Sequence, residues 1–147
     1  MYKCILIATD GSELSQKAVD SGIALAALAG ARVIALKVVP RYPISYFEGG
    51  MAIPVETAGE VEKQWVDAAQ AVVDKVKVTA QKAGVQVEAL TMISDMVAET
   101  LVATAQKHSC DLIVKASHGR RGINRVLMGS ETLYVLTHSS IPVLILK

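Results

Sequence analysis

Short apolar segments alternate with longer amphipathic segments along the whole chain, and this alternation constrains the fold more than any other feature. The short runs are rich in branched apolar residues, and the longer segments carry apolar residues at helical spacing. This pattern predicts an α/β domain in which helices cover both faces of a five-stranded parallel sheet. Strands are predicted at Lys3–Thr9, Arg32–Val39, Val85–Ile93, Leu112–Val114 and Pro142–Leu146, and helices from the cap Ser12 to Gly30, at Thr57–Ala83, at Asp95–His108 and from Ser130 to about His138.

The order of the strands follows from which of them are apolar on both faces. Val85, Val87 and Ala89 alternate with the polar Gln86 and Glu88, which is typical of a half-exposed edge strand. The first and fourth strands are apolar on both faces and belong in the middle of the sheet. With right-handed crossovers, these requirements predict the order 3-2-1-4-5. A length of 147 residues suits one domain, residues 1–147.

Composition describes the core and disfavours several classes of partner. Hydrophobic residues make up 52% of the chain and aromatic residues only 4%, so the core is expected to be aliphatic. A formal net charge of +1 provides no field that would attract nucleic acid or an acidic membrane. The first apolar run is too short for a signal peptide, and the most apolar helical segment, Ile23–Ala31, is too short to cross a bilayer. We therefore expect a cytoplasmic protein whose partners include neither nucleic acid nor a membrane.

A few side chains invite a functional interpretation that their surroundings argue against. Cys4 and Cys110 have no metal-binding or redox spacing and adjoin apolar strand residues, which favours buried free thiols. Trp65 lies in the apolar stripe of the long helix and is interpreted as a core residue rather than a binding platform. The small residues Ser21 and Gly22 are expected to let the first helix pack closely on the sheet.

The predicted strand order opens a crevice at one edge of the sheet. In the order 3-2-1-4-5 the chain leaves the first and fourth strands in opposite directions, so their carboxyl ends separate. Asp10 lies on one lip of this crevice and the segment from Ala116 to Gly119 on the other. On its own, the sequence at Asp10 also fits a simple turn followed by a helix cap.

A segment rich in glycine and arginine follows the fourth strand. Residues 117–125 carry Gly119, Gly122 and three arginines, and Gly129 and Ser130 then open the next helix, with Ser130 as the expected N-cap. The free N–H groups of a first helical turn and the helix dipole favour an anion. The segment therefore predicts phosphate binding, although an ordinary helix start would explain the last two residues on their own.

The spacing of this segment resembles the nucleotide-binding signature of the universal stress protein family. That signature is glycine, two residues, glycine, nine residues, and then glycine followed by serine or threonine. Here Gly119, the nine residues Arg120–Met128, and Gly129 with Ser130 match it, while Ala116 stands in place of the first glycine. The added methyl group is expected to cause a small adjustment rather than to abolish binding. The resemblance covers essentially the whole chain and implies the same strand order.

The resemblance and the crevice together give a set of candidate nucleotide-binding residues. The start of the last helix would hold the phosphates, with added charge from the two arginines after Gly119. Asp10 would act as a polar anchor, and the resemblance implies that its neighbours and Val38 border the adenine and ribose, while His118 and Gly119 lie beside the ribose and first phosphate. The full set is Ala8, Thr9, Asp10, Val38, Lys115, Ala116, His118, Gly119, Arg120, Arg121, Gly129, Ser130 and Glu131.

The expected ligand is an adenine nucleotide, ATP or AMP, and the expected role is regulatory. No nucleophile with an adjacent base and orienting group can be assembled, and no carboxylate cluster marks a pair of metal ions. Mg²⁺ or Mn²⁺ would be carried by the triphosphate of ATP rather than by direct protein ligands. These observations favour binding with at most slow ATP hydrolysis. The alternatives are a true ATPase or nucleotidyl transferase, and a nucleotide-free dimeric scaffold or partner-binding module.

Two further segments point to possible partners. The last strand, Val143–Leu146, is apolar on both faces although it would form a sheet edge, and such an edge invites pairing with another chain. The resemblance implies the same arrangement, an antiparallel pairing of last strands in a homodimer. The long irregular segment Pro40–Glu56 carries Tyr42, Tyr46 and Phe47, and it either folds over the ligand site, meets a partner chain or packs on its own helix.

Overall fold

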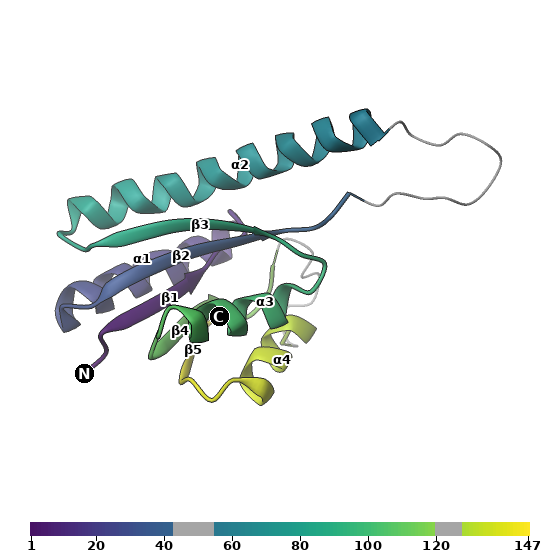
Figure 1. Ribbon diagram of the computed structural model, residues 1–147. Coiled ribbons are helices and arrows are strands. Elements are labelled where there is room, and N and C mark those ends of the chain that lie inside the picture. Colours follow the sequence, from purple (N-terminus) through teal and green to yellow (C-terminus); the bar gives the residue numbers. More distant parts are fainter. Residues whose placement is uncertain (43–54, 120–127) are drawn as a thin grey trace.

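The predicted α/β architecture is confirmed by a computed structural model that describes residues 1–42, 55–119 and 128–147 (Figure 1). Five parallel strands form one sheet in the order β3-β2-β1-β4-β5. The strands are β1 Cys4–Ala8, β2 Arg32–Val39, β3 Val87–Ile93, β4 Leu112–Ala116 and β5 Val143–Leu146, and the helices are α1 Glu13–Ala29, α2 Val55–Lys82, α3 Val97–Lys107 and α4 Ser130–His138.

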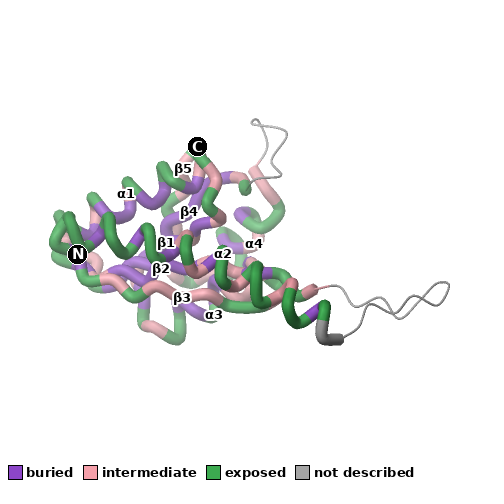
Figure 2. The backbone as a smooth tube through the Cα atoms, turned by 90° about the horizontal axis from the view of Figure 1, so that it is seen from above, coloured by how far each residue is buried: buried purple, intermediate pink, exposed green. Residues whose placement is uncertain are grey.

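The two central strands are buried on both faces, as their composition predicts. In β1, Ile5 and Ile7 face a core formed with α1 and α2, whereas Cys4 and Leu6 face a second core formed with α3 and α4. Alternate side chains of a strand point to opposite faces, so one short apolar run supplies both cores. Buried residues accordingly follow the sheet and the inner sides of the helices, and exposed residues follow the outer sides (Figure 2). The edge strand β3 is only half-buried, as predicted.

Close packing of α1 on the sheet depends on a glycine. A Cβ atom at Gly22 would lie 2.6 Å from Cδ1 of Ile7, so a larger residue would force either the buried Ile7 side chain or the helix to shift. The predicted ends of this helix are also confirmed. The Ser12 side chain accepts a hydrogen bond from the Ser15 N–H, and Gly30 ends the helix in the left-handed conformation, with φ of 66°.

Trp65 is not a core residue, so that prediction is wrong. Its side chain is 36% exposed and makes a tilted ring contact with Tyr42, with 5.6 Å between ring centroids. The reason is geometric: α2 is about 42 Å long at 1.5 Å per residue, whereas β3 spans about 23 Å. The part of α2 nearer its first residue therefore extends past the sheet (Figure 1), and its buried residues concentrate further along the helix.

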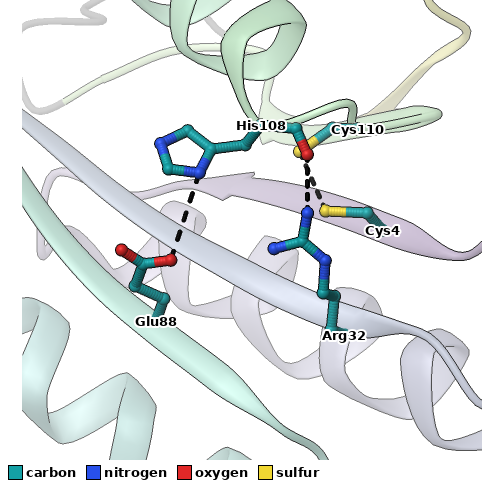
Figure 3. A network of polar contacts seen from close by, with 5 residues as sticks. All are labelled: Cys4, Arg32, Glu88, His108 and Cys110. Atoms are coloured by element: carbon teal, nitrogen blue, oxygen red, sulfur yellow. Dashed lines mark hydrogen bonds and ion pairs between the residues drawn. The ribbon is translucent and has the colours of Figure 1, made fainter.

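The two cysteines are confirmed as buried free thiols, and they lie in a compact cluster at the amino ends of the strands (Figure 3). The Sγ atoms of Cys4 and Cys110 are 3.1 Å apart, and burial raises the pKa of the Cys110 thiol well above its usual value. Beside them the Arg32 guanidinium donates a hydrogen bond of 2.6 Å to the carbonyl oxygen of His108, and the His108 ring lies 4.0 Å from the Glu88 carboxylate. These contacts connect the end of α3 to β2 and β3.

No helix in the described parts of the chain combines the length and the apolar character needed to cross a bilayer.

Candidate functional site

The carboxyl ends of β1 and β4 lie next to each other and open a pocket between them. From β1 the chain passes to α1 on one face of the sheet, and from β4 it passes to α4 on the other face. The resulting crevice is the topological switch point predicted from the strand order. It holds a pocket with a cavity volume of about 90 Å³, lined by Ala8, Thr9, Asp10, Ser15, Leu36, Val38, Val97, Ala98, Leu101, Lys115, Ala116, His118, Gly119, Glu131 and Val135.

The β1 lip of the pocket is held in place by local hydrogen bonds. Thr9 is buried, its N–H donates to the carbonyl oxygen of Leu36 at 3.0 Å, and its hydroxyl lies 3.1 Å from that of Ser15. Oδ1 of Asp10 accepts a 2.9 Å hydrogen bond from the Ser12 N–H at the start of α1. The carboxylate of Asp10 is therefore held at the pocket wall by the same turn that begins the helix.

The β4 lip is joined to the beginning of α4. The carbonyl oxygen of Ser117 accepts hydrogen bonds of 3.0 Å from the Gly129 N–H and from the Thr132 hydroxyl. The Ser117 hydroxyl lies 2.6 Å from Nδ1 of His118, a contact that orients the imidazole ring at the pocket. The first turn of α4 is thus fixed against the strand end, although residues 120–127 separate them in the sequence.

Two glycines of the predicted signature occupy places where a side chain would be crowded. A Cβ atom at Gly119 would lie 2.8 Å from Oδ2 of Asp10, and one at Gly129 would lie 3.2 Å from the carbonyl oxygen of Ser117. Gly129, and not Ser130 as predicted, is the N-cap of α4. The hydrogen bond between Gly129 and Ser117 places the chain so that Ser130 already belongs to the helix. Among the described residues α4 has no side-chain cap, so the N–H groups of its first turn receive no side-chain acceptor there.

Lys115 is the most unusual residue of the pocket. Its side chain is only 9% exposed, and Nζ donates to the carbonyl oxygen of Ala116 at 2.8 Å and to the hydroxyl of Thr132. Burial lowers the pKa of the Lys115 ammonium, and the nearby carboxylates of Glu131 and Asp10 act in the opposite direction. The pocket wall therefore includes a buried amino group together with two acidic side chains, those of Asp10 and Glu131.

Most of the candidate residues come together in this pocket. Gly129 and Ser130 form the start of α4 but do not line the cavity, and Arg120 and Arg121 lie outside the described residues. Residues 43–54 of the irregular segment also lie outside them, so the three interpretations of that segment stay open. The candidates that do line the pocket are Ala8, Thr9, Asp10, Val38, Lys115, Ala116, His118, Gly119 and Glu131.

Sequence reasoning missed the apolar wall of the pocket. Leu36 comes from β2, Val97, Ala98 and Leu101 from α3, and Val135 from α4. Val97 and Leu101 lie at helical spacing, and this spacing contains no signal that separates sheet contacts from pocket contacts. Ser15 was also missed, and its only signal was its position in the first turn of the helix that follows β1.

Among the residues that the structure describes, no group of three or more histidine, cysteine, aspartate or glutamate side chains could hold a metal ion. The carboxylates of Asp10 and Glu131 are the acidic groups of the pocket.

The fold and the pocket together define a doubly wound α/β domain with a ligand crevice at its switch point. The sequence matches the universal stress protein family over residues 1–147, and the chain belongs to that family. Universal stress protein MJ0531 of Methanocaldococcus jannaschii is 34% identical to it over 148 residues, which cover 100% of this chain and 83% of MJ0531.

Solved structures show the same fold. The structure of MJ0577, a second universal stress protein of M. jannaschii, has a TM-score of 0.85 at 28% identity, covering 100% of this chain and 96% of that one. A universal stress protein in complex with cAMP has a TM-score of 0.67 at 24% identity, covering 99% and 96% of the two chains. One from Archaeoglobus fulgidus in complex with dAMP has a TM-score of 0.62 at 20% identity, covering 99% and 98%.

Proposed function

We propose that this protein binds an adenine nucleotide, ATP or AMP, in the pocket between β1 and β4 and acts as a regulatory universal stress protein. The observation that carries the proposal is the convergence of the two strand ends and the first turn of α4 on one pocket. Residues far apart in the sequence meet there, and the strand order alone predicts a ligand site at that point.

The two sides of the pocket suit the two parts of a nucleotide. Leu36, Val38, Val97 and Leu101 give one side an apolar surface that fits a flat base. The first turn of α4, with its uncapped N–H groups, and the ring of His118 provide donors for phosphate oxygens. The described residues enclose about 90 Å³, less than the roughly 300 to 1,000 Å³ of typical ligand pockets. Only part of the nucleotide would then lie inside, with the phosphates along the open lip.

Related structures support the choice of an adenine nucleotide. Two universal stress proteins with this fold were solved with cAMP and with dAMP. At 24% and 20% identity the likeness concerns the fold, so these complexes support the statement that a fold of this kind can hold an adenine mononucleotide. With ATP as ligand, Mg²⁺ or Mn²⁺ would be bound through the phosphates.

Slow hydrolysis of ATP is the second candidate activity, and one contact bears on it. The Ser117 hydroxyl lies 2.6 Å from a nitrogen of His118, which resembles a nucleophile beside a base. Ser117 is only 2% exposed, so its hydroxyl is poorly placed to attack a phosphate in the pocket. The contact fits an orienting role for Ser117, and we therefore place binding before turnover.

We further propose that the protein forms a homodimer through β5. This strand pairs only with β4 in the described chain, so one of its edges carries unpaired backbone groups. Leu144 in its middle is 39% exposed. A second copy of β5 would satisfy the backbone groups and cover this side chain.

Thermal unfolding with ATP and Mg²⁺, with AMP and with GTP tests nucleotide binding. A ligand at a hundred times its dissociation constant stabilises by about 2.7 kcal/mol, which raises the Tm of a domain of this size by about 5 to 10 °C. We expect this shift with the adenine nucleotides and not with GTP. If nucleotide-free protein shows no shift with any of them, the scaffold alternative replaces this proposal.

A glycine substitution locates the site. Gly129→Glu would place a bulky carboxylate at the start of α4 and should abolish the shift. Its backbone, with φ of −62° and ψ of 152°, accepts any residue, but the new Cβ atom would lie 3.2 Å from the carbonyl oxygen of Ser117, so we expect the ligand-free Tm to fall slightly. Gly59→Glu is the matched control, since Gly59 lies on α2 and no described residue beyond its own helical turn has an atom within 4 Å of its Cβ position. Equal nucleotide binding by the two variants would contradict the assignment of the phosphates to α4.

A further inference from the structure

Lys115 interrupts an otherwise apolar strand. In β4, Ile113 and Lys115 are two residues apart and therefore point to the same face of the sheet, and Ile113 is fully buried in the core formed with α3 and α4. Lysine is almost never buried in proteins unless its charge has partners. Burying the charge of Lys115 at the wall of a pocket costs free energy, and this cost calls for a functional explanation.

The partners of the ammonium leave capacity for a ligand. An ammonium has three N–H donors, and the acceptors around Nζ are the carbonyl oxygen of Ala116 and the hydroxyl of Thr132. Lys115 forms no ion pair at 4.0 Å or less with a carboxylate of the described residues. Glu131 and Asp10 balance the charge from a greater distance.

The ammonium lies beneath the first turn of α4. Thr132 belongs to that turn and is 1% exposed, and its hydroxyl contacts the carbonyl oxygens of Ala116 and Ser117 at 3.3 and 3.0 Å as well as Nζ of Lys115. Lys115 therefore adds a full positive charge below the helix end whose N–H groups already favour an anion. Glu131 belongs to the same first turn of α4, and its carboxylate supplies the negative charge near that helix end in the ligand-free protein.

We propose that Lys115 is a specificity-determining residue that makes this pocket select a nucleoside phosphate over the uncharged nucleoside, with Glu131 as the carboxylate that the phosphate replaces as counter-charge. The proposal rests on the proposed nucleotide binding and names the part of the ligand that the pocket discriminates. A phosphate beside Nζ would accept the third N–H and would favour the charged ammonium. Glu131 competes with the phosphate for the same positive region, so its charge lowers the affinity for the anion.

A purely structural role for Lys115 makes a different prediction. If the side chain only fastens β4 to α4 through Thr132, its replacement would change stability and would weaken all ligands of the pocket by the same factor. A role in selection changes the ratio of the two affinities, whatever happens to stability. The ratio of the dissociation constants of adenosine and AMP is therefore the quantity to measure.

Calorimetric titration of nucleotide-free protein with adenosine and with AMP, both without metal ions, measures this ratio. The variants are Lys115→Met, which removes the charge, Lys115→Gln, which keeps a polar group, and Glu131→Gln. Lys107→Met and Glu60→Gln are matched controls, because Lys107 is an exposed residue at the end of α3 and Glu60 an exposed residue of α2. Thermal unfolding of each ligand-free variant verifies that it is folded.

We expect both Lys115 variants to lower the preference for AMP over adenosine by about tenfold or more, as loss of a charge-assisted hydrogen bond would do. We expect Glu131→Gln to raise that preference about two- to fivefold and the controls to leave it unchanged. If Lys115→Met fails to fold, Lys115→Gln decides the question.

The remaining outcomes separate this proposal from the one on which it rests. Wild-type protein that binds adenosine and AMP equally well would leave adenine binding standing and overturn the selection by Lys115. An unchanged preference for AMP over adenosine in both Lys115 variants would also leave adenine binding standing and overturn the selection by Lys115. Wild-type protein that binds neither ligand would overturn both proposals.

Discussion

Gly119 and Asp10 bring the two lips of the pocket into contact, since a Cβ atom at Gly119 would lie 2.8 Å from Oδ2 of the Asp10 carboxylate. The other oxygen of that carboxylate accepts the Ser12 N–H, so the side chain is held from one direction and crowded from the other. A glycine at this place lets the end of β4 approach the end of β1. The position of the Asp10 carboxylate thus depends on the absence of a side chain at Gly119.

Gly119→Ala is predicted to weaken nucleotide binding with little loss of stability. Gly119 is not among the residues with positive φ, so its backbone accepts alanine, and the methyl group would displace the Asp10 carboxylate rather than main-chain atoms. We expect a change in the free energy of unfolding within about 1 kcal/mol and a loss of AMP affinity of about tenfold. Urea unfolding and titration with AMP measure the two quantities. Unchanged affinity would show that Asp10 does not need its present position for binding.

Ala116→Gly restores the first glycine of the family signature. Ala116 is 5% exposed and lines the pocket, so its methyl group occupies space at the wall. We expect the variant to bind AMP more tightly, by up to about tenfold, and to lose about 0.5 to 1 kcal/mol of stability because glycine is more flexible in the unfolded chain. Titration and urea unfolding of the same preparation test both effects. Weaker binding by the variant would mean that the methyl group contributes a favourable contact with the ligand.

The sheet and the crevice could be predicted from the sequence because the rules involved are local. Alternating apolar and amphipathic segments define strands and helices, and right-handed crossovers then order the strands. Asp10 and Gly119 are placed on opposite lips by that order alone. The same rules give the closeness of α1 to the sheet, since only a small residue such as Gly22 allows it.

The features that could not be predicted from the sequence depend on how the helices pack on the sheet. Periodicity assigns Trp65 to a helix face but does not say that the sheet ends beneath it. Val97 and Leu101 lie on the same apolar face of α3 as residues that only pack against the sheet, so periodicity does not identify them as pocket residues. The burial of Lys115 depends on Thr132, which meets it through the docking of α4, a tertiary contact between residues of separate elements.

Lys115→Met is predicted to stabilise the ligand-free protein at neutral pH. The fold lowers the pKa of Lys115, so the folded state disfavours the charged form and stability is reduced while the amine is protonated. This cost is present below the folded pKa and is relieved as the pH rises from that value towards the usual 10.5. We expect a gain of about 1 to 3 kcal/mol at pH 7 that shrinks as the pH approaches 10. Urea unfolding at a series of pH values measures it, and a less stable variant would mean that the hydrogen bonds to Ala116 and Thr132 outweigh the burial cost.

Leu144→Lys tests the proposed dimer. A charged side chain in the middle of β5 would be buried without a partner if two copies paired there, whereas a monomer would expose it to water. We expect wild-type protein to sediment as a dimer at micromolar concentration and the variant as a monomer that still binds AMP. Leu28→Lys is the control, since Leu28 is 87% exposed on α1 and does not belong to the pairing strand. A monomeric wild-type protein would remove the dimer proposal.

Asp111 holds the beginning of β1 with its carboxylate, and its removal should weaken the protein in a pH-dependent way. The carboxylate accepts hydrogen bonds from the Lys3 N–H at 2.9 Å and from the Cys4 N–H at 3.1 Å. Desolvation alone would raise the pKa of Asp111, but these backbone hydrogen bonds outweigh it and hold the pKa below its usual value. Because the folded-state pKa is lowered, the stabilisation is present above the unfolded-state pKa and is lost as the pH falls through the folded-state pKa.

Asp111→Asn would replace one acceptor oxygen by an amide group that can only donate towards the same N–H groups. We expect a loss of about 1 to 2 kcal/mol at pH 7, less than for a fully buried carboxylate because Asp111 is partly exposed. The difference from wild type should narrow as the pH falls below about 4, where the wild-type carboxylate becomes protonated. Urea unfolding between pH 3 and pH 7 measures this, with Asp67→Asn on the exposed side of α2 as control. A difference that does not change with pH would mean that shape, rather than charge, is what the start of β1 requires from Asp111.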